Sequence, residues 1–125
     1  MSRVLLLQRA LWATAFFNAG GAVLFFFPRS VGQLVPLPLP APLFYSWFCA
    51  AVIGIFAGVY AWQALQERPS RPLLVVSALG KTAFFAICAI SWLLGESSGR
   101  VVAIASLDIV FAAIFLYCMP RQGAA

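Results

Sequence analysis

The 125-residue sequence contains no histidine and only three acidic side chains. Histidine is the usual base of hydrolytic triads and a common metal ligand, so its absence excludes catalytic and metal sites that depend on it. The apolar segments contain one lysine and one aspartate, which are few groups for acid–base catalysis. The sequence therefore predicts no catalytic residue, no metal, no cofactor and no enzymatic activity.

Cysteine is also scarce, and its three copies are far apart. Cys49, Cys88 and Cys118 all lie inside apolar segments, and no two of them form a C-x-x-C motif. A dithiol relay of the quinone-linked or mercury-carrier kind requires such a pair. We expect the three thiols to pack as small buried hydrophobic side chains.

Charge is the third scarcity. Charged residues make up 9% of the chain and hydrophobic residues 64%, whereas a soluble domain carries about 25% charged residues. The net charge of +5 does not indicate nucleic-acid binding, because the basic residues are not clustered on one segment. Most of them stand beside apolar runs or in short loops, which is typical of membrane proteins.

Four long apolar segments predict an all-α integral membrane four-helix bundle with short loops, a single domain over residues 1–125. The spans are expected at about residues 10–27, 44–65, 73–94 and 101–118. As a helix, the third would be roughly 33 Å long, enough to cross a hydrocarbon core of about 30 Å. The residues before position 10 are expected to lie at the membrane interface or to extend the first helix.

The connections between spans differ in character. Residues 66–72 and 95–100 are short and polar, so the second and third spans, and the third and fourth, should be antiparallel neighbours. The longer connection over residues 28–43 predicts an extended or polyproline-like segment, because prolines stand at alternate positions: Pro36, Pro38, Pro40 and Pro42. Its apolar residues should lie on the membrane surface or cap the bundle: Val35, Leu37 and Leu39.

The distribution of arginine predicts the orientation in the membrane. With four spans, one side collects Arg3, Arg9, Arg68, Arg71 and Arg121. The other side has only Arg29 and Arg100. By the positive-inside rule, both termini should be cytoplasmic in a bacterial inner membrane, with the proline-rich loop outside.

Small residues predict where helices approach closely. Gly20 and Gly21 follow Asn18 in the first span, and Gly54 and Gly58 form a G-x-x-x-G motif in the second. Such stripes let two backbones pack together. We expect the partner to be another helix of this chain rather than a second copy, although the sequence leaves both open.

Lys81 is the most informative residue, because a charge near the bilayer centre costs about 2.5–3.5 kcal/mol on insertion scales. Helical rise places its Cα within about 7 Å of the depth of Asp108 on the fourth span. We therefore expect a buried ion pair. Asn18, Ser77 and Tyr60 complete the candidate polar core, with Asn18 favoured as a hydrogen bond between helices over a ligand contact.

Two interpretations of this core are weighed evenly. Intramembrane ionisable residues indicate a proton relay or a cavity for a polar or charged ligand. A structural ion pair that fixes helix register is equally compatible with the pattern, although such pairs are often replaceable by apolar residues.

The order of motifs resembles a family of small four-span bacterial membrane proteins of uncharacterised function. That family has Asn-x-x-Gly in a first helix ending in Pro, then Gly-x-Tyr, Gly-Lys and an aspartate. The matching residues are Asn18, Gly21, Pro28, Gly58, Tyr60, Gly80, Lys81 and Asp108. The resemblance covers almost the whole chain and implies the fold and the membrane location, not an activity. Ile109 and Val110 stand where the family has aromatic residues after the aspartate.

The sequence favours a non-enzymatic accessory or scaffold subunit of the inner membrane. The alternative is a small-molecule or proton-coupled transporter that uses Lys81 and Asp108, and a membrane enzyme ranks third. Small multidrug transporters are similar in size, but the first helix here lacks the glutamate that their mechanism needs. Expected partners are the lipid bilayer and either a membrane protein or a second copy, with no nucleic acid.

Overall fold

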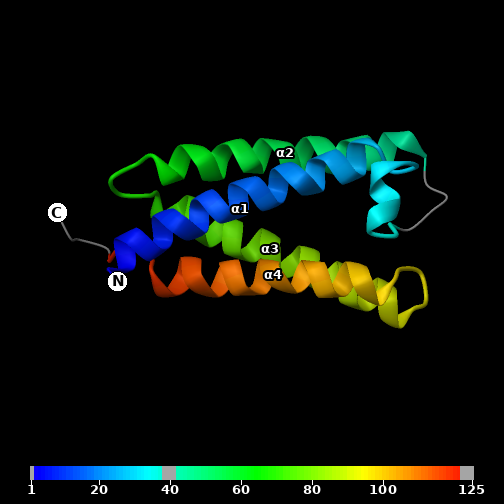
Figure 1. Ribbon diagram of the computed structural model, residues 1–125. Helices are drawn as coiled ribbons and strands as arrows, with labels where there is room; N and C mark the ends of the chain where they lie inside the picture. Colours follow the sequence, from blue (N-terminus) through cyan, green and yellow to red (C-terminus); the bar gives the residue numbers. More distant parts are fainter. Residues whose placement is uncertain (1, 38–41, 122–125) are drawn as a thin grey trace.

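The computed structural model describes residues 2–37 and 42–121, and these form helices and turns without a strand. The long helices are α1 (Arg3–Phe26), α2 (Leu43–Ala64), α3 (Arg71–Leu93) and α4 (Gly99–Tyr117), and one short 3₁₀ helix, η1 (Val31–Leu34), follows α1 (Figure 1). All four α-helices are long and apolar enough to cross a membrane. The predicted all-α bundle of four spans is confirmed.

Serine fixes the start of three of these helices. The hydroxyls of Ser2, Ser70 and Ser98 each accept a hydrogen bond from a backbone N–H three residues later, at the beginning of α1, α3 and α4. This N-cap satisfies one of the free N–H groups of the first turn. Because the cap of α1 is Ser2 and nothing interrupts the helix before Phe26, residues 3–9 extend the first helix.

A glycine two residues after the end of α3 terminates this helix. Gly95 has a φ of +78°, and its N–H donates to the carbonyl of Trp92 over 2.9 Å. The N–H of Glu96 donates to the carbonyl of Ser91 over 2.8 Å. This is a Schellman motif, which requires the left-handed conformation that glycine adopts without strain.

The helices form two antiparallel pairs. α1 packs along α2 and α3 packs along α4, and a smaller contact between α1 and α4 joins the pairs. α2 and α3 run in opposite directions, but no Cα atoms of these two helices lie within 8 Å of each other (Figure 1). The expected antiparallel direction is confirmed, but the two helices meet only through side chains, such as Tyr60 and Leu74 of one buried cluster, and their backbones do not pack closely. The short loop over residues 65–70 fixes the direction of α3, whereas the helix contacts fix its distance.

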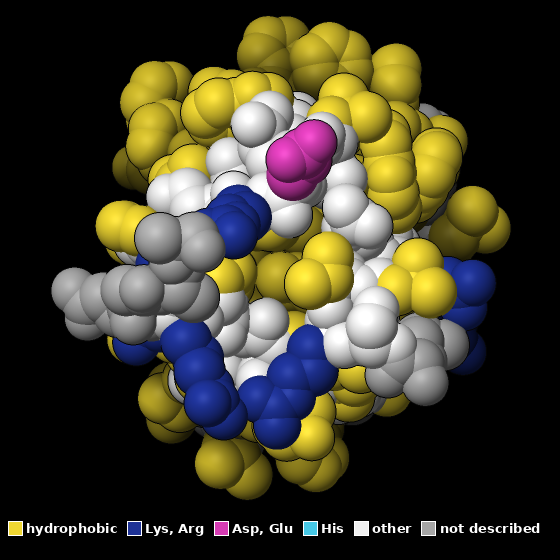
Figure 2. All heavy atoms as spheres, turned by 90° about the vertical axis from the view of Figure 1, so that its left-hand side faces the viewer, with side chains coloured by type: hydrophobic (Ala, Val, Ile, Leu, Met, Phe, Trp, Pro, Cys, Tyr) yellow, Lys and Arg dark blue, Asp and Glu magenta, His cyan; other side chains and the backbone are white. Residues whose placement is uncertain are grey.

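The two ends of the bundle are built differently. At the end of the bundle where α1 begins and α4 ends (Figure 1), side chains from all four α-helices form one buried cluster: Leu7, Ala10, Leu11, Ala15, Tyr60, Ala64, Leu74, Phe115 and Cys118. We call this the closed end. Arginine side chains gather on its outer surface (Figure 2), since the only lysine of the chain, Lys81, is buried. Arg71 ties the C-terminal tail to it by donating to the carbonyl of Pro120 over 2.9 Å.

The opposite end is covered by the loop between α1 and α2. Val31–Leu34 is a 3₁₀ helix rather than extended chain, so the polyproline-like expectation is wrong for this part, and Pro38, Leu39 and Pro40 lie outside the described residues. No proline falls between 31 and 34, and Gly32 donates to the carbonyl of Phe27 over 2.8 Å. Val35 and Leu37 pack on a cluster of α3 and α4 residues, as expected of a cap: Cys88, Val101 and Ala105.

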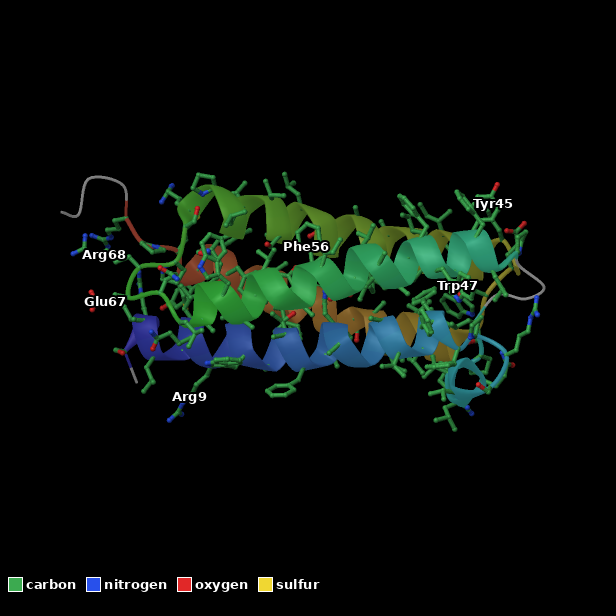
Figure 3. The ribbon with its side chains drawn as sticks, turned by 90° about the horizontal axis from the view of Figure 1, so that it is seen from above. Arg9, Tyr45, Trp47, Phe56, Glu67 and Arg68 are labelled. Atoms are coloured by element: carbon green, nitrogen blue, oxygen red, sulfur yellow. The ribbon has the colours of Figure 1, made fainter. Side chains whose placement is uncertain are left out.

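Two of the four predicted packing glycines lie in the contact between α1 and α2. A Cβ atom at Gly21 would lie 3.5 Å from Ile53, and one at Gly54 would lie 3.6 Å from Ala22. The other two have no atom within 4 Å of an added Cβ and do not pack against a helix: Gly20 and Gly58. α1 and α2 are inclined to each other (Figures 1 and 3), so only part of the stripe lies at their crossing.

Candidate functional site

The predicted ion pair forms in the middle of the bundle. Lys81 Nζ lies 2.6 Å from Asp108 Oδ1, and the two side chains are only 4% and 6% exposed. Lys81 is near the middle of α3 and Asp108 is at the middle of α4, so both charges sit at mid-depth in the spans. Ala78 and Ala105 are buried nearby, and these small side chains let α3 and α4 approach closely.

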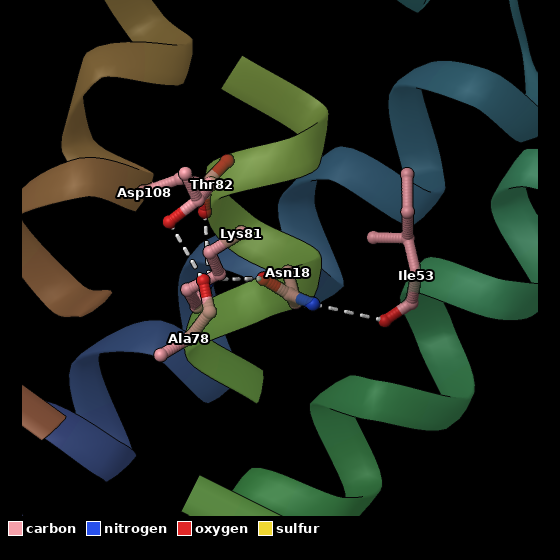
Figure 4. Close-up of polar contacts among 6 residues, drawn as sticks. All are labelled: Asn18, Ile53, Ala78, Lys81, Thr82 and Asp108. Atoms are coloured by element: carbon pink, nitrogen blue, oxygen red, sulfur yellow. Dashed lines mark hydrogen bonds and ion pairs between the residues drawn. The ribbon is translucent and has the colours of Figure 1, made fainter. Parts of the chain in front are cut away.

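Asn18 connects this pair to the other two helices (Figure 4). Lys81 Nζ donates to Asn18 Oδ1 over 3.4 Å, and Asn18 Nδ2 donates to the carbonyl of Ile53 on α2 over 3.3 Å. One hydrogen-bonded network therefore reaches all four helices. Asn18 makes the contact between helices that was expected of it, and it also contacts the charged pair.

Aromatic rings surround the lysine ammonium. The ring centroids of Tyr60, Phe111 and Phe17 lie 5.0, 5.3 and 5.8 Å from Lys81 Nζ. The negative face of an aromatic ring attracts a cation, and the attraction grows when water is excluded. Together with Asp108, these rings offset the cost of burying the charge. Phe17 and Phe111 were not among the predicted site residues.

The sequence held a weak signal for these two rings. Phe111 stands three residues after Asp108, on the same face of a helix, and Phe17 adjoins Asn18. Among 12 phenylalanines, however, such spacing does not single out two of them.

Ser77 and Tyr60 extend the polar region toward the closed end. Both side chains are buried, each 3% exposed. Ser77 stands one turn before Lys81 on α3 and lies close enough to the Tyr60 hydroxyl of α2 to interact with it. Tyr60 therefore faces the lysine with its ring and Ser77 with its hydroxyl, and it belongs to the closed-end cluster as well.

A cavity of about 340 Å³ lies beside the network, where α2 and α3 stand apart. We call it the α2–α3 cleft. Its lining includes the polar side chains of the network, Asn18, Lys81 and Asp108, together with Ser77. Its walls carry five aromatic rings from α1, α2 and α3: Phe17, Phe25, Phe56, Tyr60 and Phe84. Figure 3 shows Phe56 between the ribbons of α2 and α3.

The boundaries of the cleft differ on its three sides. Val35 and Leu37 of the loop cover it at one end, and Tyr60 of the closed-end cluster borders the other. On the third side the lining residues of α2 and α3 are exposed, among them Val52 and Ile87. In a membrane this side faces lipid.

The described residues offer no other chemical centre. No three His, Cys, Asp or Glu side chains in the described part of the chain lie together. The three cysteines are free and separate, with Cys88 and Cys118 buried and Cys49 half-buried. The site thus presents one buried acid and one buried base, paired with each other beside an aromatic cavity.

No protein-family model, curated protein or solved structure matches this chain. The resemblance to a family of small four-span membrane proteins therefore stays a prediction, and the site is interpreted from its geometry alone.

Proposed function

We propose that this chain is a small multi-pass protein of the bacterial inner membrane that binds a small molecule in the α2–α3 cleft. It acts as a binding protein or transporter and not as an enzyme. The observation that carries the proposal is the position of the Lys81–Asp108 pair, which lines a cavity between separated helices. Among the functions that the sequence left open, this geometry favours the transporter over the scaffold.

A purely structural ion pair would not need the cavity. Protein interiors are packed at nearly crystalline density, and filling a void with apolar side chains stabilises them. Here Gly80 faces open space along the cleft, although an added Cβ would have no atom within 4 Å. An unfilled space beside a charged pair is the arrangement expected of a binding site.

The orientation belongs to the same proposal. Arg9 and Arg68 lie at the closed end of the bundle (Figure 3), and the helix ends place Arg3, Arg71 and Arg121 there as well. The positive-inside rule then makes this end cytoplasmic. Reporter fusions at position 37 and after residue 121 test the orientation, since only the second should give cytoplasmic activity. A periplasmic signal from the second fusion would reverse it.

The binding function is tested by asking what the protein carries out of the membrane. The full chain is purified from inner membranes in mild detergent, denatured, and the released organic molecules are identified by mass spectrometry. We expect a small molecule that is retained by the wild type and by Gly58→Leu but lost from Gly80→Leu. Both glycines have open space around an added Cβ, and only Gly80 lines the cleft.

The accessory role predicts a different result. In that case the wild type and both variants would release the same molecules. A larger membrane protein would co-purify with each of them at a fixed stoichiometry. That outcome would replace the binding function by the scaffold that the sequence favoured.

A further inference from the structure

We propose that the α2–α3 cleft takes an uncharged, lipid-soluble molecule that carries a ring and a hydrogen-bond-accepting oxygen. The molecule enters sideways from the bilayer between α2 and α3, and its oxygen accepts a hydrogen bond from Lys81. This inference rests on the proposed binding function and adds the chemical class of the ligand and its route.

The charges of the site are already matched. Asp108 lies 2.6 Å from the ammonium of Lys81, and three aromatic rings lie within 5.8 Å of it. A cationic ligand would need the place beside Asp108 and the aromatic rings that the Lys81 ammonium already occupies. An anionic ligand would bring a second negative charge beside Asp108, and the single Lys81 ammonium could not neutralise both in a low dielectric. A neutral ligand avoids both penalties.

The lysine retains one hydrogen-bond donor for a ligand. An ammonium group has three N–H bonds and accepts none. Among the described residues, Asp108 Oδ1 and Asn18 Oδ1 are the two acceptors within hydrogen-bond distance of Lys81 Nζ. The side-chain amide of Asn18 is itself engaged with the carbonyl of Ile53. An oxygen acceptor on the ligand would therefore satisfy the third N–H of Lys81.

The walls indicate a ring rather than a flexible lipid. Five aromatic side chains line the cleft, and aromatic surfaces favour stacked or edge-to-face contact with another ring. A volume of about 340 Å³ is at the small end of ligand pockets. The donor lies at mid-depth in the spans, whereas a phospholipid keeps its head group about 15 Å away at the membrane surface. These facts favour one compact molecule that is soluble in the bilayer core.

The route follows from what surrounds the cleft. The closed-end cluster lies at one end, and Val35 and Leu37 lie over the other. Between α2 and α3, exposed residues line an opening to the lipid: Val52, Gly80, Ala83 and Ile87. An added Cβ at Gly80 would have no atom within 4 Å, so a leucine there would extend into this open space and narrow the mouth.

Benzophenone is a suitable probe, because it is an uncharged diaryl ketone that bonds covalently to nearby C–H groups under ultraviolet light. The full chain is reconstituted in phosphatidylcholine vesicles and irradiated with the probe, and adducts are mapped by mass spectrometry. We expect them on the cleft-lining residues of α2 and α3, such as Phe56 and Phe84. Labelling should fall about tenfold or more in Gly80→Leu, the effect of losing about 1.4 kcal/mol of binding, and should be unchanged in Gly58→Leu.

Three competitors of similar shape test the ligand class. Fluorenone is an uncharged ketone, diphenylmethane lacks the oxygen, and benzoylbenzoate adds a negative charge. We expect fluorenone to compete about tenfold better than diphenylmethane, which cannot accept a hydrogen bond from Lys81. It should also compete about tenfold better than benzoylbenzoate, whose carboxylate would add a second negative charge beside Asp108. In the double variant Lys81→Met with Asp108→Leu, which keeps a neutral core and has no side-chain donor at either position, fluorenone should lose its advantage over diphenylmethane.

The outcomes separate the ligand class from the binding function. If diphenylmethane or benzoylbenzoate competes as well as fluorenone while Gly80→Leu still abolishes labelling, the cleft binds a small molecule but the class is wrong. If fluorenone keeps its advantage in the double variant, the oxygen does not contact Lys81. If adducts spread over the lipid-facing surface equally in Gly80→Leu and Gly58→Leu, the cleft is no binding site and the proposed function fails too.

Discussion

The closed end and the cleft half of the bundle contain the same kinds of residue but differ in packing. At the closed end, large side chains such as Phe115, Leu11 and Leu74 are at most 1% exposed and fill the space between four helices. In the cleft half, Phe56 and Phe84 are only half-buried and border a cavity. Hydrophobicity therefore decides which segments enter the membrane, whereas the shape of their side chains decides where the helices pack tightly against each other.

The charged pair stands at the boundary between the two halves, and breaking it should have the largest effect. Lys81→Met or Asp108→Asn alone leaves one buried charge unpaired, and we expect a loss of about 3–5 kcal/mol in the free energy of unfolding. Each single variant leaves one charge without its partner, whereas the double variant removes both charges. The double variant should therefore lose less free energy of unfolding than the sum of the two single losses. Unfolding in detergent across the four proteins measures this coupling.

A matched control for this cycle is Arg29→Met, at an exposed arginine in the loop between α1 and α2. It should change the free energy of unfolding by less than about 0.5 kcal/mol. Additive losses of the two single variants would mean that Lys81 and Asp108 do not stabilise each other.

Aromatic truncations compare the two halves directly. Phe115 is 0% exposed within the closed-end cluster and packs against Tyr60 with ring centroids 5.8 Å apart. Phe115→Ala should therefore destabilise by about 3 kcal/mol, whereas Phe84→Ala should lose about 1 kcal/mol because its ring already borders a cavity. Thermal unfolding in detergent distinguishes the two. Equal losses would show that the cleft half is as tightly packed as the closed end.

Glycine substitutions test the contact between α1 and α2. Gly54→Leu adds a side chain at a position where the Cβ alone would lie 3.6 Å from Ala22, and we expect overpacking of about 2 kcal/mol. Gly58→Leu, one turn away, enters open space and should be neutral or stabilising by up to about 1 kcal/mol through helix propensity. Detergent stability of both variants is the measurement. Similar losses at both sites would place Gly58 in a helix contact.

The smallest expected effect on stability is at Gly32, in the loop that covers one end of the cleft. A Cβ at Gly32 would lie 2.8 Å from the carbonyl oxygen of Leu24, so Gly32→Ala must shift η1 away from α1. We expect a loss of about 1 kcal/mol in stability and stronger benzophenone labelling as Val35 and Leu37 move. Gly20→Ala, which meets no atom within 4 Å, is the control. Unchanged labelling in Gly32→Ala would mean that the loop does not limit access.

The sequence alone determined the class, the four spans and the ion pair. Continuous apolar runs of about 20 residues cross a membrane as helices, because a spanning strand needs only about 10 residues and a helix pairs every backbone N–H and C=O within itself. The pairing of Lys81 with Asp108 was predictable for a similar reason. A buried charge demands a partner, and helical rise placed one candidate at the right depth.

Only the tertiary structure decided which helices touch. Short loops make α2 and α3 antiparallel, but helix direction does not fix distance, and the inclination of α1 to α2 brings Gly54 into contact and leaves Gly58 free. The aromatic surroundings of Lys81 depend on the same geometry, since Phe17, Tyr60 and Phe111 come from three helices. Side-chain packing between distant segments is set by shape, and a one-dimensional pattern of apolar residues contains no measure of it.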